Sequence, residues 1–276
     1  FCDALETKIT DGEFEELILV PPTSSDCTLV LSGGKFGKIK TQSGTNEKGL
    51  YLAKYLAPDY FFYTKPAGGS DYTQLVDASA VTELADVIIK KHTHTVGADG
   101  KCTECGFTLE AQVGDAYYAY FSSAVKAAAE AGGTVKLLCN VTTSGPRNIA
   151  ALPSGTYTLD LAGHKLSVGT DAENPGAFNC GDDTVLTIIS TDGAGILNVG
   201  LYIHGDFKVA ANLSVEGLVN IYKSLEVDST SYAAPTFNGE VTVTDGGTLT
   251  VRHGNFRKDV TVESGGKLNA FERNAG

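Results

Sequence analysis

Alternating hydrophobic and polar positions run through the second half of the chain and repeat at a fixed interval near its end. The segment Val241–Leu249 (VTVTDGGTL) recurs as Val260–Leu268 (VTVESGGKL), an offset of 19 residues with six of nine positions identical. Alternation of this kind predicts strands, and self-similarity at about 20 residues is typical of stacked repeats. The Gly-Gly pair in each copy supplies the positive φ that a tight corner needs. We therefore predict an all-β fold of stacked rungs, a β-solenoid.

Strand patterns continue upstream of this repeat, in segments 134–138, 156–161, 185–189, 196–199 and 201–203. A β-sandwich also has short, regularly spaced strands, but it does not require a sequence repeat. Ahead of these strands, residues 117–131 change to an apolar period near 3.6 and end at Gly132-Gly133. That pattern predicts an amphipathic helix at the N-terminal end of the solenoid.

The first third of the chain has a mixed pattern. It predicts strands within residues 15–45, one short helix within 50–56, and the aromatic cluster Tyr60–Tyr63. Residues 75–91 are expected to be an extended connector, and the segment 92–106 is small, polar and rich in turn-forming residues.

Charge narrows the range of partners. The chain carries 21 Lys and Arg against 33 Asp and Glu, a formal net charge of −12. Nucleic acids and anionic lipids are bound mainly through Lys and Arg, so we expect neither partner. No apolar stretch reaches the roughly 18 residues of a membrane span, and no membrane insertion is predicted. A chain that starts at Phe1 suggests a processed protein or a fragment of a longer array.

Two histidines and two cysteines form the sharpest candidate site. His92 and His94 lie on one face of an extended segment, and Cys102 and Cys105 form a Cys-x-x-Cys turn seven residues later. Four N and S ligands suit tetrahedral Zn²⁺, and a site with all four positions filled by protein is structural. The alternative is a Cys102–Cys105 disulfide with two solvated histidines.

The remaining cysteines allow two interpretations. Cys2 with Cys27, and Cys139 with Cys180, are either disulfides or buried thiols, and the sequence does not decide between them.

No catalytic residues are predicted. Asp182-Asp183 is a carboxylate pair of the kind that glycosidases use, but an Asp-rich turn between strands explains it equally well. The histidine of the Leu161–Leu166 corner, His164, fits a turn residue. Other polar groups have no motif around them: His204, His253, Arg147, Arg252 and Arg257.

Several segments resemble one group of secreted proteins. Ala124–Val141 (AVKAAAEAGGTVKLLCNV) resembles the N-terminal cap of pectate-lyase-like right-handed β-helices in Gram-positive bacterial surface proteins, and Tyr157–Leu166 (YTLDLAGHKL) is similar to their first rung. The segment 92–106 resembles their His/Cys spacer, and residues 33–63 resemble the cap that closes a preceding module.

The resemblance implies a right-handed parallel β-helix with an N-terminal capping helix, preceded by a small α+β segment and a His/Cys metal-clip linker. The expected domains are residues 1–75 (end and cap of a preceding module), 76–115 (linker with the zinc-like motif) and 116–276 (β-helix module with its helix).

The resemblance also implies a function, because such proteins include adhesins and captors of antibody variable domains. We expect a non-catalytic, extracellular or cell-wall-associated module of a Gram-positive bacterium. Its partners would be a host protein such as an immunoglobulin variable domain, as for B-cell superantigens, and other modules of the same surface protein. Binding residues are not predicted. The alternatives are a β-helix polysaccharide lyase or glycoside hydrolase, and a structural spacer, because one fold serves many functions.

Overall fold

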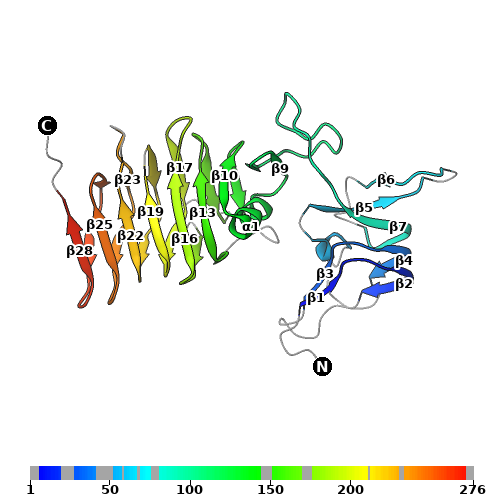
Figure 1. The fold of residues 1–276 in the computed structure, drawn as a ribbon, viewed down its shortest axis with the longest axis horizontal. Helices are drawn as coiled ribbons and strands as arrows, with labels where there is room; N and C mark the ends of the chain where they lie inside the picture. The colour runs from blue at the N-terminus through cyan, green and yellow to red at the C-terminus, as the bar shows by residue number, and fades with distance from the viewer. Residues whose placement is uncertain are drawn as a thin grey trace. The chain divides into compact units, whose positions relative to one another are not determined.

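A computed structural model describes residues 6–19, 28–41, 52–57, 59–66, 69–75, 81–143, 151–169, 176–210, 212–229 and 233–271. The chain divides into two compact units: Phe1–Thr95 with Cys102–Phe107, and Val96–Lys101 with Thr108–Gly276. Both are built mainly from strands (Figure 1), and the described residues contain one α-helix. None of the helices in these ranges is long and apolar enough to cross a membrane.

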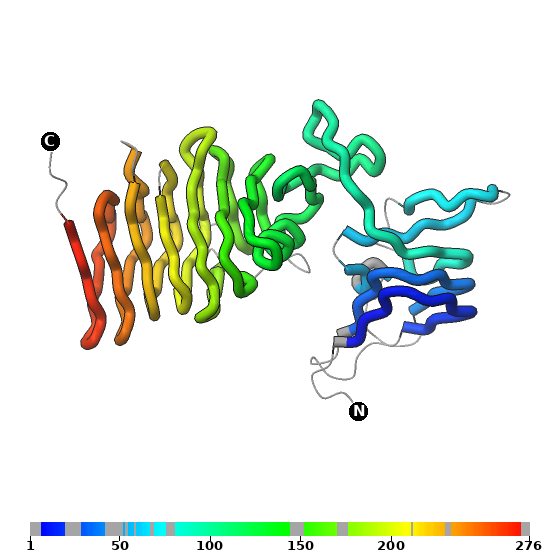
Figure 2. Tube along the Cα trace, viewed as in Figure 1, coloured from blue at the N-terminus to red at the C-terminus, as the bar shows by residue number. Residues whose placement is uncertain are grey.

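The second unit is a β-solenoid, as the repeat predicted. Three sheets run along it, and their strands follow one another in chain order from β10 to β28 (Figure 2). The nine-stranded sheet contains β28 (Lys267–Ala270), β25 (Thr248–Val251), β22 (Ser224–Val227), β19 (Asp206–Val209), β16 (Thr184–Ile189), β13 (Gly155–Asp160), β10 (Gly133–Leu137), β8 (Ala111–Val113) and β9 (Ala116–Tyr118).

Two six-stranded sheets complete the rungs. One contains β11 (Val141–Thr143), β14 (Lys165–Val168), β17 (Gly195–Asn198), β20 (Leu213–Val215), β23 (Thr236–Phe237) and β26 (Asn255–Phe256). The other contains β12 (Ala151–Leu152), β15 (Ala177–Cys180), β18 (Gly200–Ile203), β21 (Val219–Ile221), β24 (Val241–Val243) and β27 (Val260–Val262).

The 19-residue repeat is one full turn of the solenoid. Val241 pairs with Val260 in parallel, and Thr248 pairs with Lys267, both at the predicted offset of 19. Earlier turns have other lengths: 29 residues separate Gly155 from its partner Thr184 (184 − 155), and 18 separate Asp206 from Ser224 (224 − 206). Varying corner lengths explain why the repeat is visible in the sequence only near its end.

The core consists of inward-facing side chains that stack from one rung to the next. One row follows the strand register from Tyr157 to Leu186, Phe207, Leu225 and Leu249, and all five are buried. Burying one such side chain contributes roughly 1.5–3 kcal/mol. The stack therefore depends on every rung contributing a large apolar residue at the same position.

Helix α1 (Phe121–Ala131) begins four residues later than predicted. Residues 116–118 form β9, antiparallel to β8, so the apolar residues there satisfy a strand pair instead of a helix turn. The Glu110 carboxylate accepts a hydrogen bond from the Phe121 N–H at 2.7 Å and caps the helix. Its buried face packs against β8, β10 and β13.

The first unit begins with two stacked rungs. Strand β1 (Glu6–Ile9) pairs in parallel with β3 (Thr28–Leu31), and β2 (Glu13–Leu19) pairs with β4 (Lys35–Thr41), both at an offset of 22 residues. The five-stranded sheet continues as β2-β4-β7-β5-β6, with β7 (Glu83–Lys91), β5 (Tyr60–Thr64) and β6 (Thr73–Gln74).

The predicted connector is wrong for residues 83–91. These residues form β7, the central strand of the sheet, antiparallel to both β4 and β5. Val87 and Ile89 are buried in the same core as Phe36 and Phe62, which is why the run Val87-Ile88-Ile89 is apolar. The predicted short helix is a 3₁₀ turn, Leu52–Tyr55, so the described part of this unit contains no α-helix.

Candidate metal centre

The four residues predicted from the sequence come together at the end of β7. His92 and His94 follow the strand directly, and Cys102 and Cys105 belong to the turn that folds back onto them; all four lie in the first unit. All are buried, with exposures of 6%, 5%, 2% and 3%. Buried imidazoles and thiols this close together are a combination that a metal ion satisfies.

The ligand atoms are arranged as a tetrahedral metal requires. One nitrogen or sulfur from each residue lies within 4.8 Å of every other. His92 Nε2 is 3.3 Å from Cys102 Sγ, and His94 Nδ1 is 3.6 Å from Cys105 Sγ. Bonds of about 2.0–2.1 Å to nitrogen and about 2.3 Å to sulfur need separations of roughly this size. The group could therefore hold a metal ion after small side-chain movements.

The cysteines are thiols, which removes the disulfide alternative at Cys102 and Cys105. Cys139 and Cys180 are also free, so the interpretation of that pair as buried thiols holds. Cys2 and Cys27 lie outside the described residues.

The other nitrogen of each histidine has a partner that fixes its orientation. Tyr63 Oη lies 3.3 Å from His92 Nδ1, and the buried carboxylate of Asp59 lies 3.9 Å from His94 Nε2. The Asp59 carbonyl also accepts the His92 N–H at 2.9 Å. With Nε2 of His92 and Nδ1 of His94 directed at the thiols, the proton of each ring belongs on the opposite nitrogen. Partners in these positions orient metal-bound histidines.

The two thiols differ in acidity. Burial raises the pKa of both, but at Cys102 hydrogen bonds from the Cys105 and Glu104 backbone N–H groups and from His92 outweigh it and lower the pKa to about 5. At Cys105 burial, together with the neighbouring Cys102, raises the pKa to about 11. Without a metal the pair therefore holds one negative charge. A divalent cation would stabilise the second thiolate.

Local backbone geometry closes the site. The Thr103 N–H donates to Thr95 C=O at 2.9 Å, the Cys102 N–H donates to Phe107 C=O at 2.8 Å, and Gly106 makes the turn with a φ of 73°. The Phe61 ring lies edge-on at 5.7 Å from the His92 ring and 6.2 Å from the His94 ring. Four protein ligands under an aromatic cover leave no obvious position for a reacting water.

Asp59 and Tyr63 give a prediction that does not alter the ligands. Asp59→Asn and Tyr63→Phe each remove the partner of one histidine, and we expect each to weaken metal binding by about 10- to 100-fold. Competition with a chromophoric zinc chelator measures this. Asp71→Asn, an exposed acidic residue of the same unit, is the control and should leave the affinity unchanged. Equal affinities in all three variants would show that the histidines are positioned without these partners.

Other candidate groups do not assemble into a site. Asp182 and Asp183 lie on an exposed turn, where the Asp182 carbonyl accepts a hydrogen bond from Lys223 Nζ at 3.0 Å. The His164 N–H closes a turn onto Leu161 C=O at 2.7 Å, as expected for a corner residue. Arg252 lies 3.7 Å from a Glu226 carboxylate oxygen, and Arg147 lies outside the described residues.

Comparison of the chain with protein-family models, curated proteins and solved structures finds no match.

Proposed function

We propose that the chain is a non-catalytic binding module of a Gram-positive cell surface, that it binds a host protein, and that its metal centre is a structural zinc site. The observation that carries the binding role is an aromatic and apolar patch on the outer wall of the solenoid. The segment resemblances to surface β-helix modules support the location, and they make an immunoglobulin variable domain the first partner to test.

The patch lies on two neighbouring strands of one sheet. Tyr202 pairs with Asn220, which places Leu218 beside Gly200 and Tyr222 beside His204. Leu218 is 45% exposed and Tyr222 is 38% exposed, and the Tyr222 ring stacks on His204 with centroids 4.2 Å apart and planes 4° apart. Exposed tyrosine and grouped apolar side chains are typical of protein-binding surfaces. We call Tyr202, His204, Leu218 and Tyr222 the wall patch.

The zinc role rests on the chemistry of the donors. Two thiols and two imidazoles in a closed tetrahedral arrangement suit Zn²⁺, and full occupation by protein ligands suits a structural site. The ion would tie the Cys102–Cys105 turn to the end of β7. The segment would then act as the clip that the resemblance implies.

Two further parts of the proposal concern architecture. Helix α1 is the cap of the solenoid, supported by its buried Phe121, Ala124 and Val125, which belong to the same core as the rungs. The first unit is the end of a preceding module, supported by its two stacked rungs, β1–β2 and β3–β4.

The binding role is tested with a panel of immunoglobulin Fab fragments immobilised for surface plasmon resonance. We expect binding by the whole chain and a loss of at least about 30-fold in the Leu218→Ser, Tyr222→Ala double variant, because a few central aromatic residues dominate most interfaces. Thr242→Ala, in the same sheet at the position next to Asn220, is the matched control and should bind normally. Absence of binding to every Fab, or equal binding by both variants, would contradict the proposal.

A further inference from the structure

The edge of the first unit's sheet has the features of a strand-binding site. Among the described residues, β2 lies at the end of the order β2-β4-β7-β5-β6 and pairs with β4 alone. It is seven residues long, Glu13–Leu19. An edge strand of this length presents a row of backbone N–H and C=O groups to which another strand can pair.

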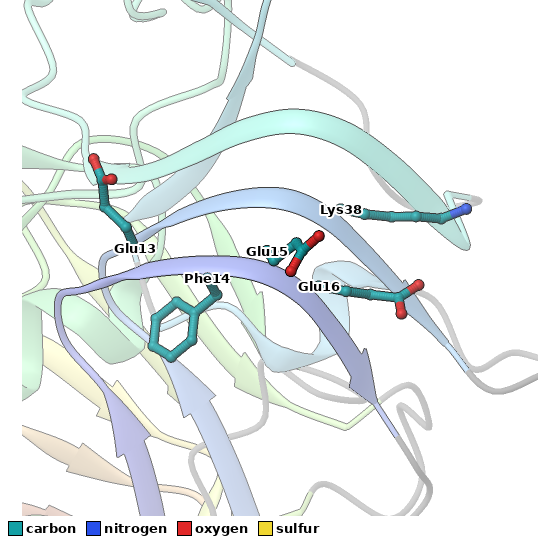
Figure 3. A pocket seen from close by; sticks show the side chains of 5 residues that line it. All are labelled: Glu13, Phe14, Glu15, Glu16 and Lys38. Carbon is teal, nitrogen blue, oxygen red and sulfur yellow. The ribbon is translucent and has the colours of Figure 1, made fainter.

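A pocket follows this edge. It is lined by four consecutive β2 residues, Glu13 to Glu16, together with Lys38 of β4 (Figure 3). Successive side chains of a strand point to opposite faces, so a pocket that touches four in a row lies along the edge of the strand and not on one face. That is where an added strand would lie.

Charges on this sheet alternate from strand to strand. Strand β4 carries lysines, and both of its neighbours carry glutamates that pair with them. The ion pairs are Lys35–Glu13 at 3.1 Å, Lys40–Glu16 at 2.7 Å and Lys38–Glu83 at 2.7 Å. Opposite charges on adjacent strands stabilise a sheet, and like charges destabilise it. The next strand beyond the acidic β2 should therefore be basic.

Two β2 side chains remain available to such a strand. Glu15 is exposed and has no ion pair among the described residues, and the Glu13 side chain is 80% exposed despite its pair with Lys35. Phe14 stacks on Phe36 with centroids 5.0 Å apart and planes 10° apart, yet it stays only half-buried. An apolar residue beside Phe14 would continue that stack.

We propose that the open edge of β2 binds an extended segment of another polypeptide that carries Lys or Arg around an apolar residue, and that this segment adds to the sheet as a further strand. Backbone pairing would provide affinity, and the carboxylates of Glu13, Glu15 and Glu16 would select a basic strand. A second copy of β2 is a poor occupant, because it would place glutamates beside glutamates. The inference goes beyond the proposed function and is independent of the wall patch, which belongs to the other unit.

The test uses a fluorescein-labelled peptide with the sequence of residues 34–41 (GKFGKIKT), which already pairs with β2 in the fold. Fluorescence anisotropy at low salt, with the full chain, should show saturable binding. The acidic peptide GEFGEIET should bind at least about tenfold more weakly, because like charges then lie side by side. A peptide of the original sequence with alternate backbone nitrogens methylated keeps its charge but cannot form the ladder, and it should bind at least about tenfold more weakly as well.

Variants of the chain complete the test. Glu15→Lys should weaken binding of the basic peptide roughly fivefold, with an unchanged circular dichroism spectrum. Asp71→Lys, next to β6 at the opposite end of the sheet, makes the same charge change and should have no effect. Undetectable binding, equal binding of the methylated peptide, or equal loss in both variants would overturn the proposal. A dimer in sedimentation that Glu15→Lys abolishes would also overturn it, by assigning the edge to a second copy.

Discussion

Removing the metal from the centre formed by His92, His94, Cys102 and Cys105 should destabilise the first unit by about 4 kcal/mol. That is the stabilisation expected when free zinc exceeds its dissociation constant about 1,000-fold. The reason is that the ion holds two buried thiolates and two buried imidazoles together, and without it one of the thiols must take up a proton. Thermal unfolding before and after exhaustive chelation measures the difference.

Cys102→Ser should reproduce this loss, and added chelator should then have no further effect. Cys139→Ser replaces a half-buried thiol that is not a ligand, and it should keep the response to chelator. A melting temperature that is the same with and without chelator in the unmodified chain would exclude a structural metal at this site.

Leu225→Ala should destabilise the solenoid by about 3–5 kcal/mol. Leu225 is fully buried and lies in register between Phe207 of one rung and Leu249 of the next. A solenoid rung has neighbours only above and below, so the lost side chain leaves a cavity that the flanking rungs cannot easily fill. Core leucine-to-alanine changes of this kind cost about 2.7–5.0 kcal/mol.

Urea unfolding monitored by circular dichroism measures this effect. Ser224→Ala is the matched control, because it is the neighbouring residue of the same strand and is only half-buried; it should change stability by less than about 0.5 kcal/mol. A loss of less than about 1 kcal/mol in Leu225→Ala would mean that the rungs do not stack through this row.

The solenoid was predictable where its turns have equal length. Val241–Leu249 and Val260–Leu268 align because Val241 pairs with Val260 at an offset of 19. Upstream the offset changes with every corner, and no sequence period survives. A second repeat was missed in the first unit: residues 10–18 (TDGEFEELI) and 32–40 (SGGKFGKIK) share the Gly-x-Phe core and pair at an offset of 22. Their charges are opposite, and that concealed the likeness.

The metal ligands were predictable from spacing, whereas the residues that orient them were not. His92, His94, Cys102 and Cys105 lie within one short segment. Asp59 and Tyr63 lie about 30 residues upstream and reach the histidines only because β5 pairs with β7. The apolar run Val87-Ile88-Ile89 was the signal for that pairing. It marked a buried central strand and not the end of a connector.

The most direct test of the metal centre is X-ray absorption at the zinc edge on the purified chain. The account predicts one zinc per chain, coordinated by two sulfurs at about 2.3 Å and two nitrogens at about 2.0–2.1 Å. A chain purified in the presence of zinc that holds no metal, or one whose zinc has only nitrogen and oxygen neighbours, would contradict it.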